Sequence, residues 1–160
     1  MMGIIMKSGQ DIEQVIDAAT AGLRVDKEMF IERANRVLAQ DVEDVPTELI
    51  KIALENIDEA NPDWTFVASR IYATNLYETA AKNRGYDASE QYGNFYELIK
   101  QLTEKGIYTA QLLDKYTKEE IDQLGKSIKA ENDALFHYLA IYTLATRYLA
   151  TDHDKNIYEL

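Results

Sequence analysis

Residues 61–85 read NPDWTFVASRIYATNLYETAAKNRG. Apolar side chains recur along this stretch at spacings of three and four, which predicts one long amphipathic helix. Asn61 and Pro62 form a start signal for this helix, with Asn61 as the cap and Pro62 in the first turn. The helix is expected to end near Lys82–Gly85, where glycine follows basic residues.

The same spacing recurs on both sides of this stretch. It predicts helices over residues 10–23, 26–38, 46–57, 61–85, 95–106, 117–128 and 130–149, with a short helix or turn over 108–116. Asp26 and Thr117 are expected to cap two of these helices, and Glu120 completes a capping box with Thr117. The fold class is therefore all-α: an orthogonal bundle of about seven helices. At most a minor β element is expected, at residues 4–6 or in the tail.

Composition excludes several classes of function. The formal charge of −11 makes naked nucleic acid and anionic membranes poor partners, since phosphate contacts would be repelled. The chain has no cysteine, which excludes disulfides, thiolate catalysis and cysteine-ligated metals within it. No apolar run approaches the length of about 18 residues that a membrane span requires. A cytoplasmic protein is expected.

No catalytic, cofactor or metal site is predicted. A di-iron bundle would need a Glu-x-x-His pair. Alanine precedes both His137 and His153 by three residues, so neither histidine completes that pair. His137 is interpreted as a packed or half-exposed helix residue and His153 as a solvated one.

Arg70 is the charged residue that stands out in residues 61–85, because it lies within an apolar run. A guanidinium there needs a carboxylate or several carbonyls to offset its desolvation. An internal salt bridge is the expected arrangement, with Asp133 as the proposed partner. We assign both residues a structural role.

Several segments together resemble class I ribonucleoside-diphosphate reductase large subunits. Residues 61–72 resemble a helix of that family in which an aromatic residue precedes Ala-x-Arg. Further similar segments follow in the family's order: FYELI at 95–99, EKGIY at 104–108, LLDKYTKEE at 112–120, IKAEND at 128–133, RYL at 147–149 and IYE at 157–159. Residues 10–60 look like the helical part of the ATP-cone regulatory module.

The resemblance implies two regions: residues 1–60 as a degenerate ATP-cone-like part, and residues 61–160 as the all-α N-terminal region of the large subunit. It also implies partners, namely the remaining catalytic barrel of that subunit and, through the holoenzyme, a radical-generating small subunit. The family's thiyl-radical cysteine, redox cysteine pair and catalytic carboxylate belong to the barrel. None can be carried over to this chain.

The cone-like region departs from the family pattern where phosphate would bind. Asp11 and Glu78 stand where the family often has lysine, so an anionic nucleotide would meet carboxylates without the compensating cations. We therefore expect no tight binding of ATP or dATP.

Two other interpretations remain open at this stage. One is a helical interaction module unrelated to the reductase, which would carry an open hydrophobic groove. The other is a small carboxylate–metal enzyme. The reductase interpretation instead predicts an exposed apolar surface for docking, among the last two helices or in the tail after Leu149.

Overall fold

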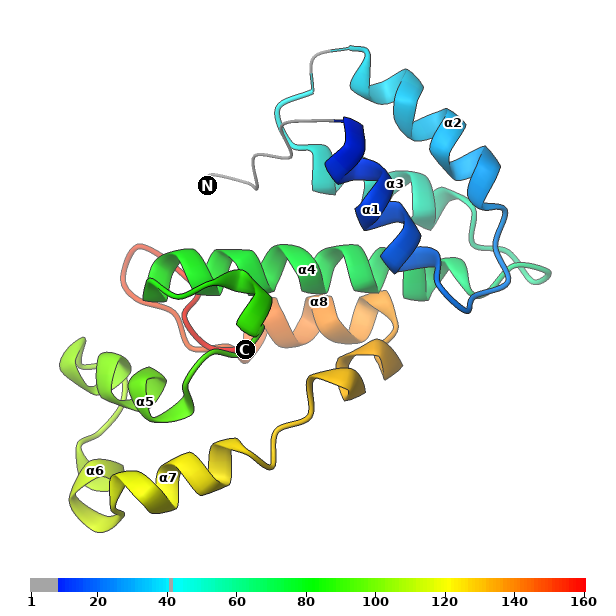
Figure 1. Ribbon diagram of the computed structural model, residues 1–160. Helices are drawn as coiled ribbons and strands as arrows, with labels where there is room; N and C mark the ends of the chain where they lie inside the picture. The colour runs from blue at the N-terminus through cyan, green and yellow to red at the C-terminus, as the bar shows by residue number, and fades with distance from the viewer. Residues whose placement is uncertain (1–8, 41) are drawn as a thin grey trace. The chain divides into compact units, whose positions relative to one another are not determined.

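The computed structural model describes residues 9–40 and 42–160, and within them it is all-α, as predicted (Figure 1). The described α-helices are α1 (Gly9–Thr20), α2 (Lys27–Leu38), α3 (Val45–Glu55), α4 (Trp64–Arg84), α5 (Phe95–Glu104), α6 (Gln111–Lys115), α7 (Lys118–Gly125) and α8 (Tyr138–Arg147). Two 3₁₀ helices, η1 (Ala88–Glu90) and η2 (Ala130–Leu135), lie between them. The predicted β element at residues 4–6 lies outside the described residues, whereas the tail holds one antiparallel bridge between Thr151 and Ile157.

Side-chain caps explain where four helices begin. Asp26, Asp44 and Asn94 each accept a hydrogen bond from the main-chain N–H three residues later, which satisfies a donor at the start of α2, α3 and α5. Thr117 and Glu120 form the predicted reciprocal capping box of α7. The start of α7 could therefore be located from sequence alone.

Two predicted helix boundaries were wrong. Helix α4 begins at Trp64 instead of Asn61, and the Asn61 side chain donates back to the carboxylate of Asp58. The predicted helix over residues 130–149 is interrupted, because η2 ends before α8 begins. His137 lies at this break, where its Nδ1 accepts a hydrogen bond from the N–H of Ala140 at 3.2 Å. A side chain that satisfies a first-turn donor favours a new helix start at this point.

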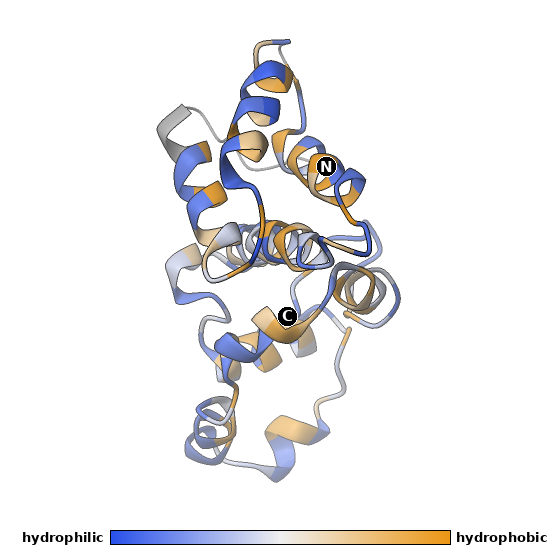
Figure 2. Cartoon of the chain, turned by 90° about the vertical axis from the view of Figure 1, so that its right-hand side faces the viewer, coloured by the Kyte–Doolittle hydropathy of each residue, from blue (hydrophilic) through white to orange (hydrophobic). Residues whose placement is uncertain are grey.

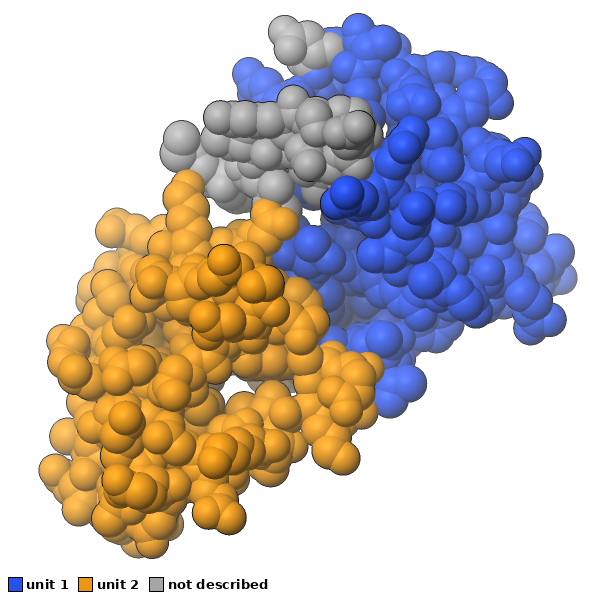
Figure 3. Space-filling model, in the orientation of Figure 1, with its two compact units in different colours: residues 1–75, 133–143 blue, residues 76–132, 144–160 orange. Residues whose placement is uncertain are grey.

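The chain divides into two compact units (Figure 3). Unit 1 comprises residues 1–75 and 133–143, and unit 2 comprises residues 76–132 and 144–160. The boundary between the two compact units falls within α4. The boundary predicted at residue 60 is of another kind, because it separates the cone-like part from the all-α N-terminal region that the family resemblance implies. The latter boundary stays a prediction.

Unit 1 encloses the larger hydrophobic core. Helices α1, α2 and α3 mix hydrophobic and hydrophilic residues along their length (Figure 2), and α2 packs against both α1 and α3. The core side chains include Ile16, Phe30, Leu49, Val67 and Ile71. Phe30 and Trp64 meet edge to face with ring centroids 5.3 Å apart, which joins α2 to the start of α4.

Unit 2 contains a smaller core around Leu98, Leu102 and Tyr158. Helix α5 packs against α6 and α7. At the α5–α7 contact a Cβ atom added to Gly125 would lie 2.6 Å from the Cβ of Phe95, so the absence of a side chain permits this close approach. Within the described ranges, no helix is both long enough and apolar enough to cross a bilayer.

Candidate docking surface

Arg70 is held by main-chain carbonyls in unit 1. Its Nη1 donates to the carbonyl of Ala21 at 2.7 Å and to that of Ala19 at 3.2 Å. Ala19 lies in the last turn of α1 and Ala21 directly follows the helix, where main-chain carbonyls lack intrahelical partners. Arg70 therefore links α4 to the end of α1. Its pairing with Asp133, which lies in η2, stays a prediction.

The residues considered as metal ligands do not gather into a site within the described ranges. No group of three or more His, Asp or Glu side chains there is arranged to hold a metal ion. His137 was predicted to be a packed or half-exposed helix residue, but it is exposed and lies just before α8, whose first turn it caps. His153 lies exposed in the tail. The described part of the chain thus offers exposed surfaces and a cleft as candidate sites.

Exposed large apolar side chains are concentrated late in the chain, where docking was expected. Leu139 on α8 is 66% exposed and Leu124 on α7 is 60% exposed. Within the described residues the full set is Ile57, Leu112, Tyr116, Leu124, Ile128, Leu135, Phe136, Leu139, Tyr142, Leu144 and Tyr148. When a partner removes such side chains from water, the complex is stabilised by about 25 cal/mol per Å² of apolar surface buried.

Unit 2 also contains a cleft of about 370 Å³, which we call the unit 2 cleft. It lies among the end of α4, the loop before α5, and the residues of α5 and α7 that face each other. Its lining consists of Arg84, Tyr92, Gly93, Asn94, Phe95, Leu98, Asp122, Gly125, Lys126, Ile128 and Leu160. The lining therefore combines an apolar wall with a few charged and amide groups, which is the usual composition of a binding pocket.

Arg84 fixes one side of the unit 2 cleft. It is 8% exposed, and its two terminal nitrogens donate to the carbonyls of Tyr92 at 2.7 Å and Asn94 at 2.9 Å. Its guanidinium also lies over the ring of Tyr86, 4.6 Å from the centroid. Burial lowers the pKa of Arg84 from its usual value. These contacts tie the end of α4 to the loop before α5.

The sequence did not single out Arg84. The available signal was a basic residue in the last turn of α4 beside Gly85, which is an ordinary helix end. Its carbonyl partners lie eight and ten residues later, in a loop without a recognisable motif.

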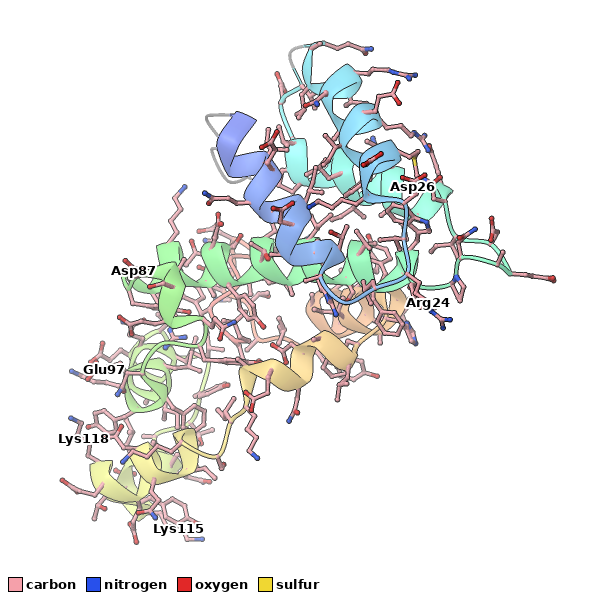
Figure 4. All side chains as sticks on the ribbon, turned by 45° about the vertical axis from the view of Figure 1, so that its right-hand side comes forward. Arg24, Asp26, Asp87, Glu97, Lys115 and Lys118 are labelled. Atoms are coloured by element: carbon pink, nitrogen blue, oxygen red, sulfur yellow. The ribbon has the colours of Figure 1, made fainter. Side chains whose placement is uncertain are left out.

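Unit 2 also carries charged side chains, among them Asp87, Glu97, Lys115 and Lys118, which are labelled in Figure 4. Asp87 caps η1 by accepting from the N–H of Ser89, and hydrogen bonds from the side chain and the N–H of Ser89 lower the pKa of Asp87. Lys118 lies over the ring of Tyr96, 5.5 Å from its centroid.

Glu78, on α4, is half-buried, and burial raises the pKa of its carboxyl. The side chain of Asp11 lies outside the described residues.

Comparison with known proteins gives one consistent family. The chain is 35% identical to the ribonucleoside-diphosphate reductase subunit alpha of Helicobacter pylori strain 26695, over 74% of this chain and 14% of that protein. It is 30% identical to the alpha subunit of phage T4, over 99% of this chain and 22% of that protein. The alpha subunit of reductase 1 from Escherichia coli K12 is 28% identical over 92% of this chain and 19% of its own length. No protein-family model matches the chain.

The all-α fold and these similarities define a helical part of a large reductase subunit. The chain belongs to the ribonucleoside-diphosphate reductase alpha-subunit family and corresponds to the N-terminal part of those proteins. It spans 14% to 22% of the length of the relatives compared above.

Proposed function

We propose that the chain is a non-catalytic helical part of a ribonucleoside-diphosphate reductase alpha subunit. Its role is to pack against the remainder of that subunit and so contribute to assembly of the enzyme that makes deoxyribonucleotides. The similarity to alpha subunits over most of the chain carries this proposal. Because the chain has no cysteine, it supplies no thiol for radical or redox chemistry.

The partners follow from this role. The remainder of the alpha subunit, with its catalytic barrel, is the direct partner, and a radical-generating small subunit is reached through the holoenzyme. Exposed apolar side chains such as Leu124 in unit 2 and Leu139 in unit 1 support direct packing, because a partner that covers them removes apolar surface from water. A cytoplasmic location belongs to the same proposal, and the net negative charge disfavours nucleic acid and anionic membranes.

Reconstitution tests the proposal. The chain and the remainder of the alpha subunit are produced as two polypeptides, mixed, and examined by sedimentation velocity and by reductase assay with the small subunit. We expect a one-to-one complex, with reductase activity that requires both polypeptides. A remainder that is fully active alone and does not bind the chain would refute the proposal.

We also propose that residues 1–60 are a degenerate ATP-cone-like region without tight nucleotide binding. The resemblance supports this, since Asp11 stands where the family often has lysine and a bound phosphate would lack that cation. Titration with dATP and magnesium, followed by calorimetry, is expected to give no heat of binding at micromolar concentrations. A micromolar or tighter magnesium-dependent site would contradict the proposal.

The alternative is an interaction module unrelated to the reductase. The 35% identity to a reductase alpha subunit argues against it. The reconstitution distinguishes the two, because an unrelated module would neither bind the remainder nor restore reductase activity.

A further inference from the structure

The unit 2 cleft differs from the exposed apolar side chains elsewhere in the chain, because it is concave. Hydrogen bonds within unit 2 support its walls. Its volume of about 370 Å³ falls in the range of pockets that enclose a ligand or an anchoring side chain. Energetic hot spots of protein interfaces are typically large side chains that enter such pockets. A flat helix face offers no equivalent enclosure.

The walls of the cleft are preorganised by contacts that need no partner. Arg84 binds the carbonyls of Tyr92 and Asn94 on one side. The Asn94 side chain caps α5 by accepting from the N–H of Glu97 at 2.9 Å. The close approach of Gly125 to Phe95 fixes α7 against α5. A preformed pocket binds more tightly because less conformational entropy is lost on association.

The chemistry of the lining indicates what enters. Phe95, Leu98 and Ile128 provide an apolar wall, and Ile128 is 39% exposed although it lines the cleft. The guanidinium of Arg84 is already bound to two carbonyls, and the remaining charged side chains of the lining, Asp122 and Lys126, have opposite signs. An apolar side chain would cover the exposed surface of Ile128, whereas a phosphate would leave it in water.

We propose that the unit 2 cleft receives a large apolar side chain from the remainder of the alpha subunit, and that this contact is the main anchor of the docking surface. The inference rests on the proposed function, since the occupant belongs to the part of the alpha subunit that this chain does not match. That part is large, because the chain spans only 14% to 22% of its relatives.

A matched pair of variants tests the anchor. Ile128→Lys places a charge in the cleft wall, and Leu124→Lys places the same charge on α7 at a more exposed residue that does not line the cleft. Affinity for the remainder of the alpha subunit is measured by calorimetry, and circular dichroism verifies that each variant is folded. We expect Ile128→Lys to weaken binding at least tenfold and Leu124→Lys to weaken it less than threefold.

A second readout avoids substitution. The main-chain amides of Gly93 and Gly125 belong to cleft residues, whereas Gly22 lies in unit 1. On binding of the remainder, the NMR signals of Gly93 and Gly125 should shift while that of Gly22 changes less. If the wild-type chain binds but Ile128→Lys binds equally well, or Gly93 and Gly125 do not shift, the anchor is refuted and the proposed function stands. Failure of the wild-type chain to bind would instead refute the proposed function, and the anchor with it.

Discussion

The hydroxyl of Tyr108 donates a hydrogen bond to the carboxylate of Glu159, 51 residues later in the sequence. The second carboxylate oxygen of Glu159 accepts from the main-chain N–H of Ala150 at 2.6 Å. The carboxylate of Glu159, near the end of the tail, thus connects Tyr108 in the loop after α5 with Ala150 at the start of the tail. Burial, followed by the contact with Glu159, raises the pKa of Tyr108.

Tyr108→Phe should destabilise the chain by about 1.5 kcal/mol, since a hydrogen bond to a charged group is lost and the aromatic packing is kept. Thermal unfolding followed by circular dichroism measures this change. Tyr116→Phe is the control, because Tyr116 is an exposed tyrosine, 43% accessible. Equal melting temperatures for Tyr108→Phe and the wild type would contradict the prediction.

Gly125→Ala should lower stability, although alanine favours helix by about 1 kcal/mol over glycine. The added Cβ would lie 2.6 Å from the Cβ of Phe95, and overpacking of this kind costs about 1–3 kcal/mol. Urea unfolding is the measurement. The control is Gln123→Ala, an exposed position on the same helix, which should leave the midpoint nearly unchanged. A more stable Gly125→Ala variant would show that α5 and α7 can separate freely.

Ser69→Ala should raise stability by about 1 kcal/mol. Ser69 is 1% exposed, and its Oγ has no hydrogen-bond partner within the described residues, so its removal relieves a desolvation penalty. Thr20→Val is the contrasting variant, because the Thr20 hydroxyl donates to the carbonyl of Ile16 at 2.8 Å. We expect Ser69→Ala to raise the melting temperature and Thr20→Val to lower it. A loss of stability in Ser69→Ala would show that the Ser69 hydroxyl is hydrogen-bonded.

Arg70→Met should cost about 1.5 kcal/mol, since two carbonyl acceptors near the end of α1 lose a charged donor while the apolar stem is retained. A double-mutant cycle with Asp133→Asn tests the predicted pairing of Arg70 with Asp133. We expect a coupling energy above about 0.5 kcal/mol, the usual limit of additivity for independent sites. Strictly additive losses would exclude that pairing.

Glu78→Gln should raise stability at neutral pH, with a gain that disappears as the pH falls. Burial raises the folded-state pKa of Glu78, so the fold favours the protonated carboxyl. The stability that protonated Glu78 contributes is therefore fully present below the pKa of Glu78 in the unfolded chain. It is lost as the pH rises through the pKa of Glu78 in the folded chain. Melting temperatures of both proteins at pH 4 and pH 7 measure the effect, and a constant difference between them would contradict it.

Local patterns predicted the helices well, because caps and turns involve residues only a few positions apart. Asp26 and Thr117 act as the predicted caps, and α5 begins at Phe95 within the predicted segment. The break before α8 was missed. Apolar spacing continues through it, and the capping contact from Ala140 to His137 is not a standard start signal.

The sequence by itself determined the all-α class, the reductase resemblance and the absence of thiol chemistry. These depend on residue identity and short spacings. The tertiary structure decided which carbonyls hold Arg70, how Arg84 supports the loop before α5, and where the unit 2 cleft lies. Those features join residues that can be 50 or so positions apart, and their contacts form only when packing of the helices offsets the entropy of ordering the chain between them.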